Sequence, residues 1–438
     1  MFAYYLNLAL RSLKRNKVLT ALMVMTIAFG VAASMTTWSV FRAMSGDPIP
    51  WKSAKLFVPQ IDSWGPARRQ PNGEPPEAMD YTDAMNLMRA HRARYQSAMY
   101  RVSPPVVPAK VGQHPFYAGG HAVFSEFFPM LDVPFQYGHP WSAADDKNRA
   151  RVVVISSDLN DKLFGGENSV GKTVNVGGKD YRITGVLDSW NPQPRYYDVV
   201  NSSSFNSKEE SLFLPFNTAI AVGMTNNGNT NCYEPPSEPG FVGLQHSTCV
   251  WLAFMVELDG ATQVAAYKRF LDGYARQQQQ AGRFTWPPNN RLRDLPQWLA
   301  YQHVVPDDAR TSLLVALGLL LVCLVNTAGL LLAKFLRRSG EIGVRRALGA
   351  SRREIYTQFL IEAGMVGLAG GVLGLVFTGL GVLGIDLVMP TSIADLSHVD
   401  GSLLGLTLLL AIVTTALAGL YPTFRAAHVQ PAWQLKTH

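Results

Sequence analysis

The sequence predicts a membrane protein with four transmembrane α-helices and a large α+β extracytoplasmic domain inserted between the first and the second helix. Three observations support this fold class. The 438 residues are 47% hydrophobic and only 16% charged, against about 25% charged in soluble proteins. Four long stretches carry no charge, and the basic residues gather in the segments that flank them. Each pattern is typical of a chain that crosses a membrane.

The four apolar stretches are long enough to span hydrocarbon, which takes about 20 residues at the helical rise. They cover residues 18–41, 313–333, 363–385 and 402–421. Core helices of a soluble protein are the weaker alternative, because buried helices rarely run this long without a charge. A cleaved signal peptide is also weaker for the first stretch, because its apolar run exceeds the roughly 7–15 residues of a signal sequence.

Charge predicts which side of the membrane each part occupies. Residues 1–17, 334–354 and 422–438 together carry 13 Lys and Arg and two Glu, whereas the rest of the chain carries 26 basic and 30 acidic residues. By the positive-inside rule these three segments are cytoplasmic, and residues 44–305 and 389–401 lie outside. The basic excess is thus explained by topology and by attraction to the lipid surface, and we expect no nucleic-acid partner.

The predicted boundaries follow from these patterns. The predicted parts are a cytoplasmic amphipathic helix (1–17), transmembrane helix 1 (18–43), the external domain (44–305), transmembrane helix 2 (306–338), a cytoplasmic helix (339–350), transmembrane helix 3 (351–388), an external loop (389–401), transmembrane helix 4 (402–424) and a cytoplasmic tail (425–438). Within the external domain, strand-like runs such as "RVVVI" and "VWLAFMVEL" mix with helix-like runs at residues 79–95 and 264–280, which predicts an α+β fold.

The string "GENSVGKT" at residues 166–173 has the spacing of a phosphate-binding loop. Such a loop needs a buried strand directly before it and a helix directly after it, so that backbone N–H groups face the phosphates. Here a short helix, "LNDKLF", precedes the string, and a predicted hairpin with a turn at Gly177 and Gly178 follows it. We therefore interpret the string as a turn and a strand start outside the cell.

Cysteine usage fits an oxidising compartment. Cys232 and Cys249 are the cysteines of the external part, and Cys323 stands alone in the second span. Their spacing of 17 positions predicts a disulfide that closes an Asn- and Pro-rich loop, the alternative being two unpaired thiols. Neither metal-ligand spacing nor a catalytic motif such as GxSxG or HExxH is present. We therefore expect no catalytic residue, no metal site and no enzyme activity in this chain.

The cytoplasmic segment between the second and third spans contains a predicted short helix at residues 341–349. Apolar and basic side chains share this segment between two glycines: Ile342, Ala347, Leu348, Arg345, Arg346, Gly340 and Gly349. Ser351, with Glu354 three residues later, predicts a capping box that starts the next helix. A charged loop that only fixes topology would not need an amphipathic helix between two glycines.

Several motifs resemble the MacB/FtsX-type ABC transporter permeases. In the membrane part these are "LVNTAGLLLAKFLRR", "EIGVRRALGASRREI" with "FLIEAG" after it, and "GLYPTFRAAHVQPAWQL". In the external part "FFPMLDVPFQYGHPW", "VVVISSDLNDKLFGG" and "VGKTVNVGGKDYRITGVL" resemble the MacB periplasmic core. The resemblance covers most of the chain. It implies a domain that does not bind nucleotide at the "GKT" string.

The resemblance implies that the 341–349 helix docks on a cytoplasmic ABC ATPase and that two permeases pair. The residues given this ATPase-coupling role are Glu341, Ile342, Gly343, Arg345, Arg346, Leu348 and Gly349. For the arginines, lipid headgroups are an equally natural partner. Only 17 residues precede the first span, so we expect the ATPase, with its ATP and Mg²⁺, on a separate subunit and no cofactor on this chain.

The third span carries a stripe of small residues, which lets helix backbones approach closely. The stripe comprises Gly364, Gly367, Gly371, Gly374, Thr378 and Gly381. It predicts helix packing, either within the chain or against a second, identical or homologous, permease. Glu362, near the inner end of the same span, is expected to be interfacial and not a proton relay.

The function expected from the resemblance is that of a permease subunit in a bacterial inner membrane, with its large domain in the periplasm. It would couple ATP hydrolysis to motion of that domain for export or extraction of a substrate, with a periplasmic adaptor as a further possible partner. The first alternative is a signalling permease of the FtsX kind that activates an envelope hydrolase or sensor kinase. A membrane-anchored binding module without an ATPase is a third reading. The sequence names no substrate.

Overall fold

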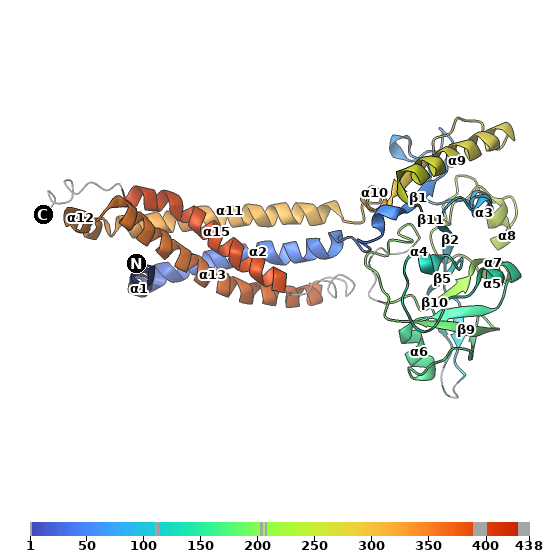
Figure 1. Ribbon diagram of the computed structural model, residues 1–438, viewed down its shortest axis with the longest axis horizontal. Coiled ribbons are helices and arrows are strands. Elements are labelled where there is room, and N and C mark those ends of the chain that lie inside the picture. Colours follow the sequence, from blue (N-terminus) through green and yellow to red (C-terminus); the bar gives the residue numbers. More distant parts are fainter. Residues whose placement is uncertain are drawn as a thin grey trace. The chain divides into compact units, whose positions relative to one another are not determined.

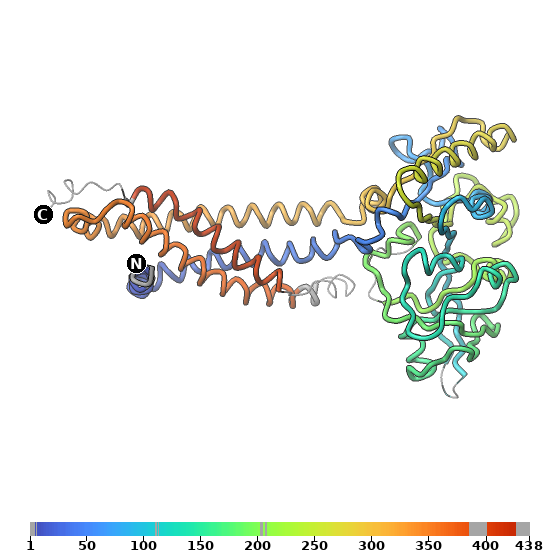
Figure 2. The backbone as a smooth tube through the Cα atoms, viewed as in Figure 1, coloured from blue at the N-terminus to red at the C-terminus, as the bar shows by residue number. Residues whose placement is uncertain are grey.

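The computed structural model describes residues 2–109, 112, 114–201, 205, 208–388 and 401–427. The chain forms two compact units. The helical unit comprises Met1–Gly46 and Val305–His438, and the α+β unit comprises Asp47–Val304. The chain therefore leaves the helical unit after its first long helix and returns to it for the rest of its length (Figures 1 and 2).

The helical unit contains the four predicted spans. Its described helices are α1 (Phe2–Arg15), α2 (Lys17–Ser45), α11 (Asp307–Leu336), α12 (Ser339–Ala347), α13 (Arg352–Val388) and α15 (Gly401–Ala427). Of these, α2, α11, α13 and α15 are long and apolar enough to cross a membrane. Most of the predicted 389–401 loop and of the predicted 425–438 tail, namely residues 389–400 and 428–438, lies outside the described residues.

The glycines of α13 face two different helices and not one. A Cβ on Gly367 would lie 2.8 Å from the Thr415 Cβ of α15, and Gly371 faces Ala411 of the same helix. Gly374 and Gly381 instead face α2. In the described residues a Cβ on Gly364 would meet no atom within 4 Å, so Gly364 makes no close contact within this chain and its predicted packing role stays a prediction. Helix α13 is 37 residues long, and its small residues let it pack closely against α15 on one side and against α2 on another.

The α+β unit is built on one mixed sheet. Its described strands are β1 (Leu56–Gln60), β2 (Tyr95–Val102), β3 (Pro105–Val107), β4 (Phe116–Tyr117), β5 (Gly120–Val123), β6 (Phe135–Gly138), β7 (Val152–Ile155), β8 (Thr173–Val176), β9 (Lys179–Leu187), β10 (Leu212–Pro215), β11 (Ala253–Glu257) and β12 (Arg291–Asp294). Their order is β12-β1-β11-β2-β5-β10-β7-β9-β8-β3-β4, with β6 beside β9. The β5–β10 and β7–β9 pairs are parallel, and the others are antiparallel.

Alternation along the strands creates a core on each face of the sheet. In β7, Val153 and Ile155 enter one apolar cluster, and Val152 and Val154 enter the other. Successive strand side chains point to opposite faces, so a strand that is apolar at every position must be covered on both sides. This explains why "VVVI" contains no polar residue.

Short helices supply that cover. They are α3 (Tyr81–Ala90), α4 (Phe127–Met130), α5 (Ala143–Asn148), α6 (Ser157–Phe164), α7 (Phe216–Ala221), α8 (Gly240–His246), α9 (Gly260–Gln280) and α10 (Leu295–Tyr301), with single 3₁₀ turns at Ser53–Lys55 and Pro71–Gly73. The helix expected over 79–95 is shorter than predicted. It begins after the N-cap Asp80 and ends at His91, whose φ of 43° terminates it, and β2 begins at Tyr95.

The "GENSVGKT" string has none of the geometry of a phosphate-binding loop. Helix α6 ends before it at Gly165, which has a φ of 71°. Thr173 begins β8, which pairs with β9 through a turn at Gly177 and Gly178. The Lys172 ammonium lies 5.3 Å from the Phe164 ring centroid and 3.8 Å from the Glu167 carboxylate. The string is a helix end followed by a hairpin, as its flanking sequence predicts.

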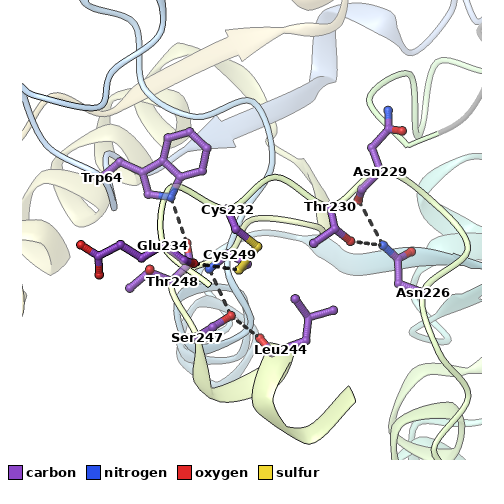
Figure 3. The surroundings of a disulfide bond; sticks show 10 residues. All are labelled: Trp64, Asn226, Asn229, Thr230, Cys232, Glu234, Leu244, Ser247, Thr248 and Cys249. Carbon is purple, nitrogen blue, oxygen red and sulfur yellow. Dashed lines mark hydrogen bonds between the residues drawn. A yellow bond between two sulfur atoms is a disulfide. The ribbon is translucent and has the colours of Figure 1, made fainter. Parts of the chain in front are cut away.

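Cys232 and Cys249 form a disulfide across 17 positions of the chain. Figure 3 shows its surroundings, where the Trp64 indole donates to the Thr248 carbonyl at 2.9 Å. A β-bridge between Asn231 and Val250 lies directly beside the disulfide. The disulfide and the β-bridge therefore join the two ends of the Asn- and Pro-rich loop.

We expect replacement of both cysteines with serine to lower the free energy of unfolding of the α+β unit by about 3 kcal/mol. The physical reason is that the cross-link restricts the unfolded chain over a loop of this length. Thermal unfolding of the full chain, with and without reductant, measures the effect. The reductant should lower the Tm of the wild-type protein and leave that of the serine variant unchanged. Equal Tm values for the two oxidised proteins would contradict the prediction.

Candidate functional site

Helix α12 joins the ends of α11 and α13 that are remote in sequence from the α+β unit. It is a short helix because Gly349, with a φ of 100°, ends it in a conformation that glycine adopts freely. The next helix begins with the predicted capping box. The Ser351 N–H donates to the Glu354 carboxylate at 2.8 Å, and the Glu354 N–H donates to the Ser351 hydroxyl at 3.2 Å. The link between α12 and α13 is therefore tight.

One side of α12 is packed into the helical unit. Ile342 is only 3% exposed and lies in a cluster with Leu331, Phe335, Ile355 and Phe359. The Phe335 and Phe359 ring centroids are 4.3 Å apart. These contacts fix α12 to the ends of α11 and α13 by burial of apolar surface.

Ion pairs hold the same helix from its polar side. Glu341 lies 3.2 Å from Arg338 and 2.7 Å from Arg345, and Arg345 also donates to Gln358 of α13 at 3.0 Å. Partial burial raises the pKa of Glu341, but Arg338, with Arg345 and Arg15, outweighs burial and holds this pKa below its ordinary value. Glu341 is therefore ionised at neutral pH and stays paired.

Beneath α12 lies a fully buried ion pair. Lys334 of α11 and Glu362 of α13 are both 0% exposed, and the Lys334 Nζ lies 2.6 Å from Glu362 Oε1. Arg338 Nη1 lies 3.2 Å from the other carboxylate oxygen, and the Ser12 hydroxyl of α1 donates to Glu362. Glu362 is thus enclosed within the protein, with partners from α11, from α1 and from the link between α11 and α12. Its expected interfacial depth in the membrane stays a prediction.

The opposite side of α12 is exposed and mainly apolar. Val344 is 55% exposed and Leu348 is 83% exposed, and Ala347 is exposed between them. Residues three and four apart share one helix face. We call Val344, Ala347 and Leu348 the outer face of α12. Burial of these apolar side chains against a partner or a lipid surface would remove them from water.

The structure divides the seven predicted coupling residues into three groups. Leu348 and Gly349 are exposed. Ile342 and Gly343 are buried against the spans, so they present no surface of their own to a partner. Glu341 and Arg345 are engaged with each other, and Arg346 also has contacts within the chain.

Sequence reasoning missed the exposure of Val344 beside Leu348 and the pairing of Lys334 with Glu362. The spacing of Val344 and Leu348 by four was the available signal for the first. For the second, the signal was a single carboxylate in an apolar span whose neighbouring span ends in Lys334, because buried charges in membranes are usually paired. Within the described ranges, no group of three or more His, Cys, Asp or Glu could hold a metal ion.

The fold and this site define a class of protein. It is a membrane protein with four spans, one large extracytoplasmic α+β domain between the first two, and a short helix fixed at the other end of the second and third. A family model for the MacB-like periplasmic core domain matches residues 20–271, and one for the FtsX-like permease C-terminal region matches residues 313–431. The chain belongs to the MacB/FtsX-type family of ABC transporter permeases.

The curated relatives of this chain share about a quarter of their aligned residues with it. The pyoverdine export ATP-binding/permease protein PvdT of Pseudomonas entomophila is 26% identical over 328 residues, which cover 72% of this chain and 42% of that protein. The macrolide export ATP-binding/permease protein MacB of Escherichia coli K12 is 24% identical over 437 residues, which cover 97% of this chain and 59% of that protein. The chain spans about half the length of the curated relatives it matches.

Solved structures similar to this chain include the periplasmic region of MacB from Actinobacillus actinomycetemcomitans. It is 14% identical, with a TM-score of 0.35, and the match covers 56% of this chain and 92% of that one. The extracellular domain of the noncanonical ABC-type transporter YknZ from Gram-positive bacteria is 15% identical, with a TM-score of 0.32, over 51% of this chain and 95% of that one.

Proposed function

We propose that this chain is the transmembrane subunit of an ABC transporter that couples ATP hydrolysis on a separate ATPase subunit to motion of its extracytoplasmic domain. The motion would serve export or extraction of a substrate. The observation that carries the proposal is α12, which is fixed rigidly on its inner side and presents exposed Val344 and Leu348 on its outer face. A docking helix needs both properties.

The rigid attachment matters because displacement of α12 must reach the spans. Ile342 packs among side chains of α11 and α13, and Arg345 connects to Gln358 of α13. Packed side chains and ion pairs resist relative displacement. A push on the outer face of α12 would therefore move the ends of α11 and α13 together.

The ATPase would bind ATP and Mg²⁺, and this chain would bind neither. The names of PvdT and MacB, "ATP-binding/permease protein", support an ATPase in the same assembly. We further propose a second permease, identical or homologous, a bacterial inner-membrane location and a periplasmic adaptor. The signalling alternative would use the same α12 contact, and it would replace the exported substrate with an envelope hydrolase or kinase on the α+β unit.

The test is affinity purification of the tagged full chain from membranes of its native host, followed by mass spectrometry and an ATPase assay. We expect the wild-type chain to retain an ABC ATPase and to hydrolyse ATP. Leu348→Asp should lower the retained ATPase and the activity at least about tenfold, because a charge would enter an apolar contact.

Thr357→Asp is the matched control, because Thr357 is exposed on the first turns of α13 and lies off the outer face of α12. It should behave as the wild-type chain. Equal recovery of the ATPase with Leu348→Asp and with the wild-type chain would refute the proposed docking role. A wild-type complex that contains no nucleotide-binding protein would refute the transporter function itself.

A further inference from the structure

The α+β unit contains a hollow of about 800 Å³ that the proposed coupling does not use. Helix α3 forms one wall, α5 and its C-terminal residue form the other, and the segment after β5 closes the base. A hollow of this size falls in the range of small-molecule sites, about 300–1,000 Å³. Its lining combines an apolar floor with a charged rim.

The floor is aromatic and sulfur-rich. Met85 and Met88 of α3 lie beside Tyr81 and Phe124. The Phe124 ring stacks on buried Phe216 with centroids 5.0 Å apart, and this stack continues to Tyr81. The aromatic side chains are held rigid by the core behind them, whereas methionine side chains adapt to the shape of a ligand. The floor therefore suits a flat or flexible apolar body.

The two acids of the lining are both engaged by neighbouring groups of the protein. Glu126 accepts from the Gln96 N–H at 2.8 Å, and its other oxygen pairs with His91 at 2.6 Å. Asp146 accepts from the Trp141 indole at 2.8 Å and from the Ser125 N–H at 2.7 Å. Each carboxylate thus has both oxygens bound to the protein. A cationic ligand would have to share these oxygens with their protein donors.

Unlike the two acids, whose oxygens are bound by the protein, the basic residues of the rim have no oppositely charged partner among the residues that the structure describes. Arg89, Lys147 and Arg149 are exposed. In the described part of the chain, none of the three has a carboxylate within ion-pair distance, and Arg89 donates only to the Asn86 side chain, at 2.9 Å. The rim therefore carries an excess of positive charge.

The charges of Arg89 and Arg149 both affect the pKa of the Tyr81 hydroxyl. Burial raises the pKa of Tyr81, and the charges of Arg89 and Arg149 oppose that rise. The hydroxyl therefore stays protonated at neutral pH and can donate a hydrogen bond. Tyr81, Arg89 and Arg149 thus line one hollow above an apolar floor, with the two cations on opposite walls, and a donor and cations around an apolar floor suit an anionic group.

We propose that this hollow binds a small amphipathic anion, with its carboxylate or sulfonate between Arg89 and Arg149 and its apolar body on Met85, Met88 and Phe124. A neutral apolar molecule would leave the two cations without a partner at the rim. The site goes beyond the coupling function and is independent of it, because binding is measured on this chain alone.

The test uses the full chain in nanodiscs of zwitterionic lipid and two probes of the same shape, 2-naphthoate and the neutral 2-naphthalenemethanol. Saturation-transfer NMR titration, with empty nanodiscs subtracted, gives the dissociation constants. We expect the chain to bind 2-naphthoate at least about tenfold more tightly than the neutral probe. Arg149→Gln should weaken 2-naphthoate binding about tenfold and leave the neutral probe unchanged, because a charge-assisted hydrogen bond is lost.

Arg276→Gln is the charge-matched control, since Arg276 is exposed on α9 and does not line the hollow. It should bind both probes as the wild-type chain does. Arg89→Gln repeats the test from the opposite wall if Arg149→Gln fails to fold. Equal affinity of the wild-type chain for the two probes would overturn the proposal, as would equal 2-naphthoate affinity in the wild-type chain and in a folded Arg149→Gln or Arg89→Gln variant.

Discussion

Replacing Lys334 with methionine is expected to destabilise the helical unit by about 3 kcal/mol. The substitution keeps the length of the side chain but leaves the Glu362 carboxylate, which is 0% exposed, without its closest counter-charge. Removal of one partner from a buried ion pair costs about 3–5 kcal/mol. The lower value applies because Arg338 remains 3.2 Å from the second carboxylate oxygen.

Unfolding of the full chain in mixed detergent micelles, followed by circular dichroism, measures this effect. Lys14→Met is the control, because Lys14 is exposed on α1, and it should unfold as the wild-type chain does. The double variant Lys334→Met with Glu362→Gln should recover part of the loss, because no buried charge is then left without a partner. A single variant as stable as the wild-type chain would show that the pair contributes nothing to the stability of the unit.

Replacing Arg283 with leucine is expected to lower the free energy of unfolding of the α+β unit by about 4 kcal/mol. Arg283 follows α9 and pairs with two buried carboxylates of α3, Asp80 at 2.7 Å and Asp83. Asp80 is also the N-cap of α3, where it accepts from the Asp83 N–H at 2.7 Å. The leucine variant would leave two neighbouring buried carboxylates without a cation.

The size of this deficit should depend on pH. Burial and the charge of Asp83 raise the pKa of Asp80 well above its ordinary value, and Arg283 opposes that rise. In the variant this pKa rises further, so a protonated Asp80 needs no counter-charge at low pH. The stability deficit should therefore grow as the pH increases through the folded-state pKa and shrink as the pH falls.

Tryptophan fluorescence during thermal unfolding of the full chain measures both effects, since seven of the nine tryptophans lie in residues 47–304. Arg276→Leu removes an exposed arginine of α9 and should leave the Tm unchanged. Adding Asp80→Asn to Arg283→Leu should restore part of the lost stability. If the leucine variant has the same deficit at every pH, the carboxylates are not the source of the loss.

Sequence patterns predicted the features that depend on local geometry. The four spans follow from runs of apolar residues, and α12 follows from a short amphipathic segment that ends at Gly349. The hairpin at Gly177 and Gly178 could be predicted because alternating apolar and polar residues on either side indicate strands and the two glycines between them indicate a tight turn. The same local reading excluded a nucleotide site at the "GKT" string, because a helix precedes the string where a strand would be needed.

The coupling site could be predicted only in part. The sequence predicted a short amphipathic helix at residues 341–349, but it could not show whether Ile342 or Val344 faces the spans. Both are β-branched apolar residues in the same helix, and their burial differs because only the Ile342 side meets Phe335 and Phe359. The orientation of α12 is set by these neighbours, which lie on other helices.

By itself, the sequence determined the number of spans, the side of the membrane expected for each basic segment, and the α+β character of the inserted domain, because apolar periodicity and charge are properties of consecutive residues. Only the tertiary structure decided that β5 pairs with β10, that the glycines of α13 divide between α2 and α15, and that Glu362 meets Lys334. These pairings join residues distant in the chain, so they depend on which surfaces meet when the elements pack together.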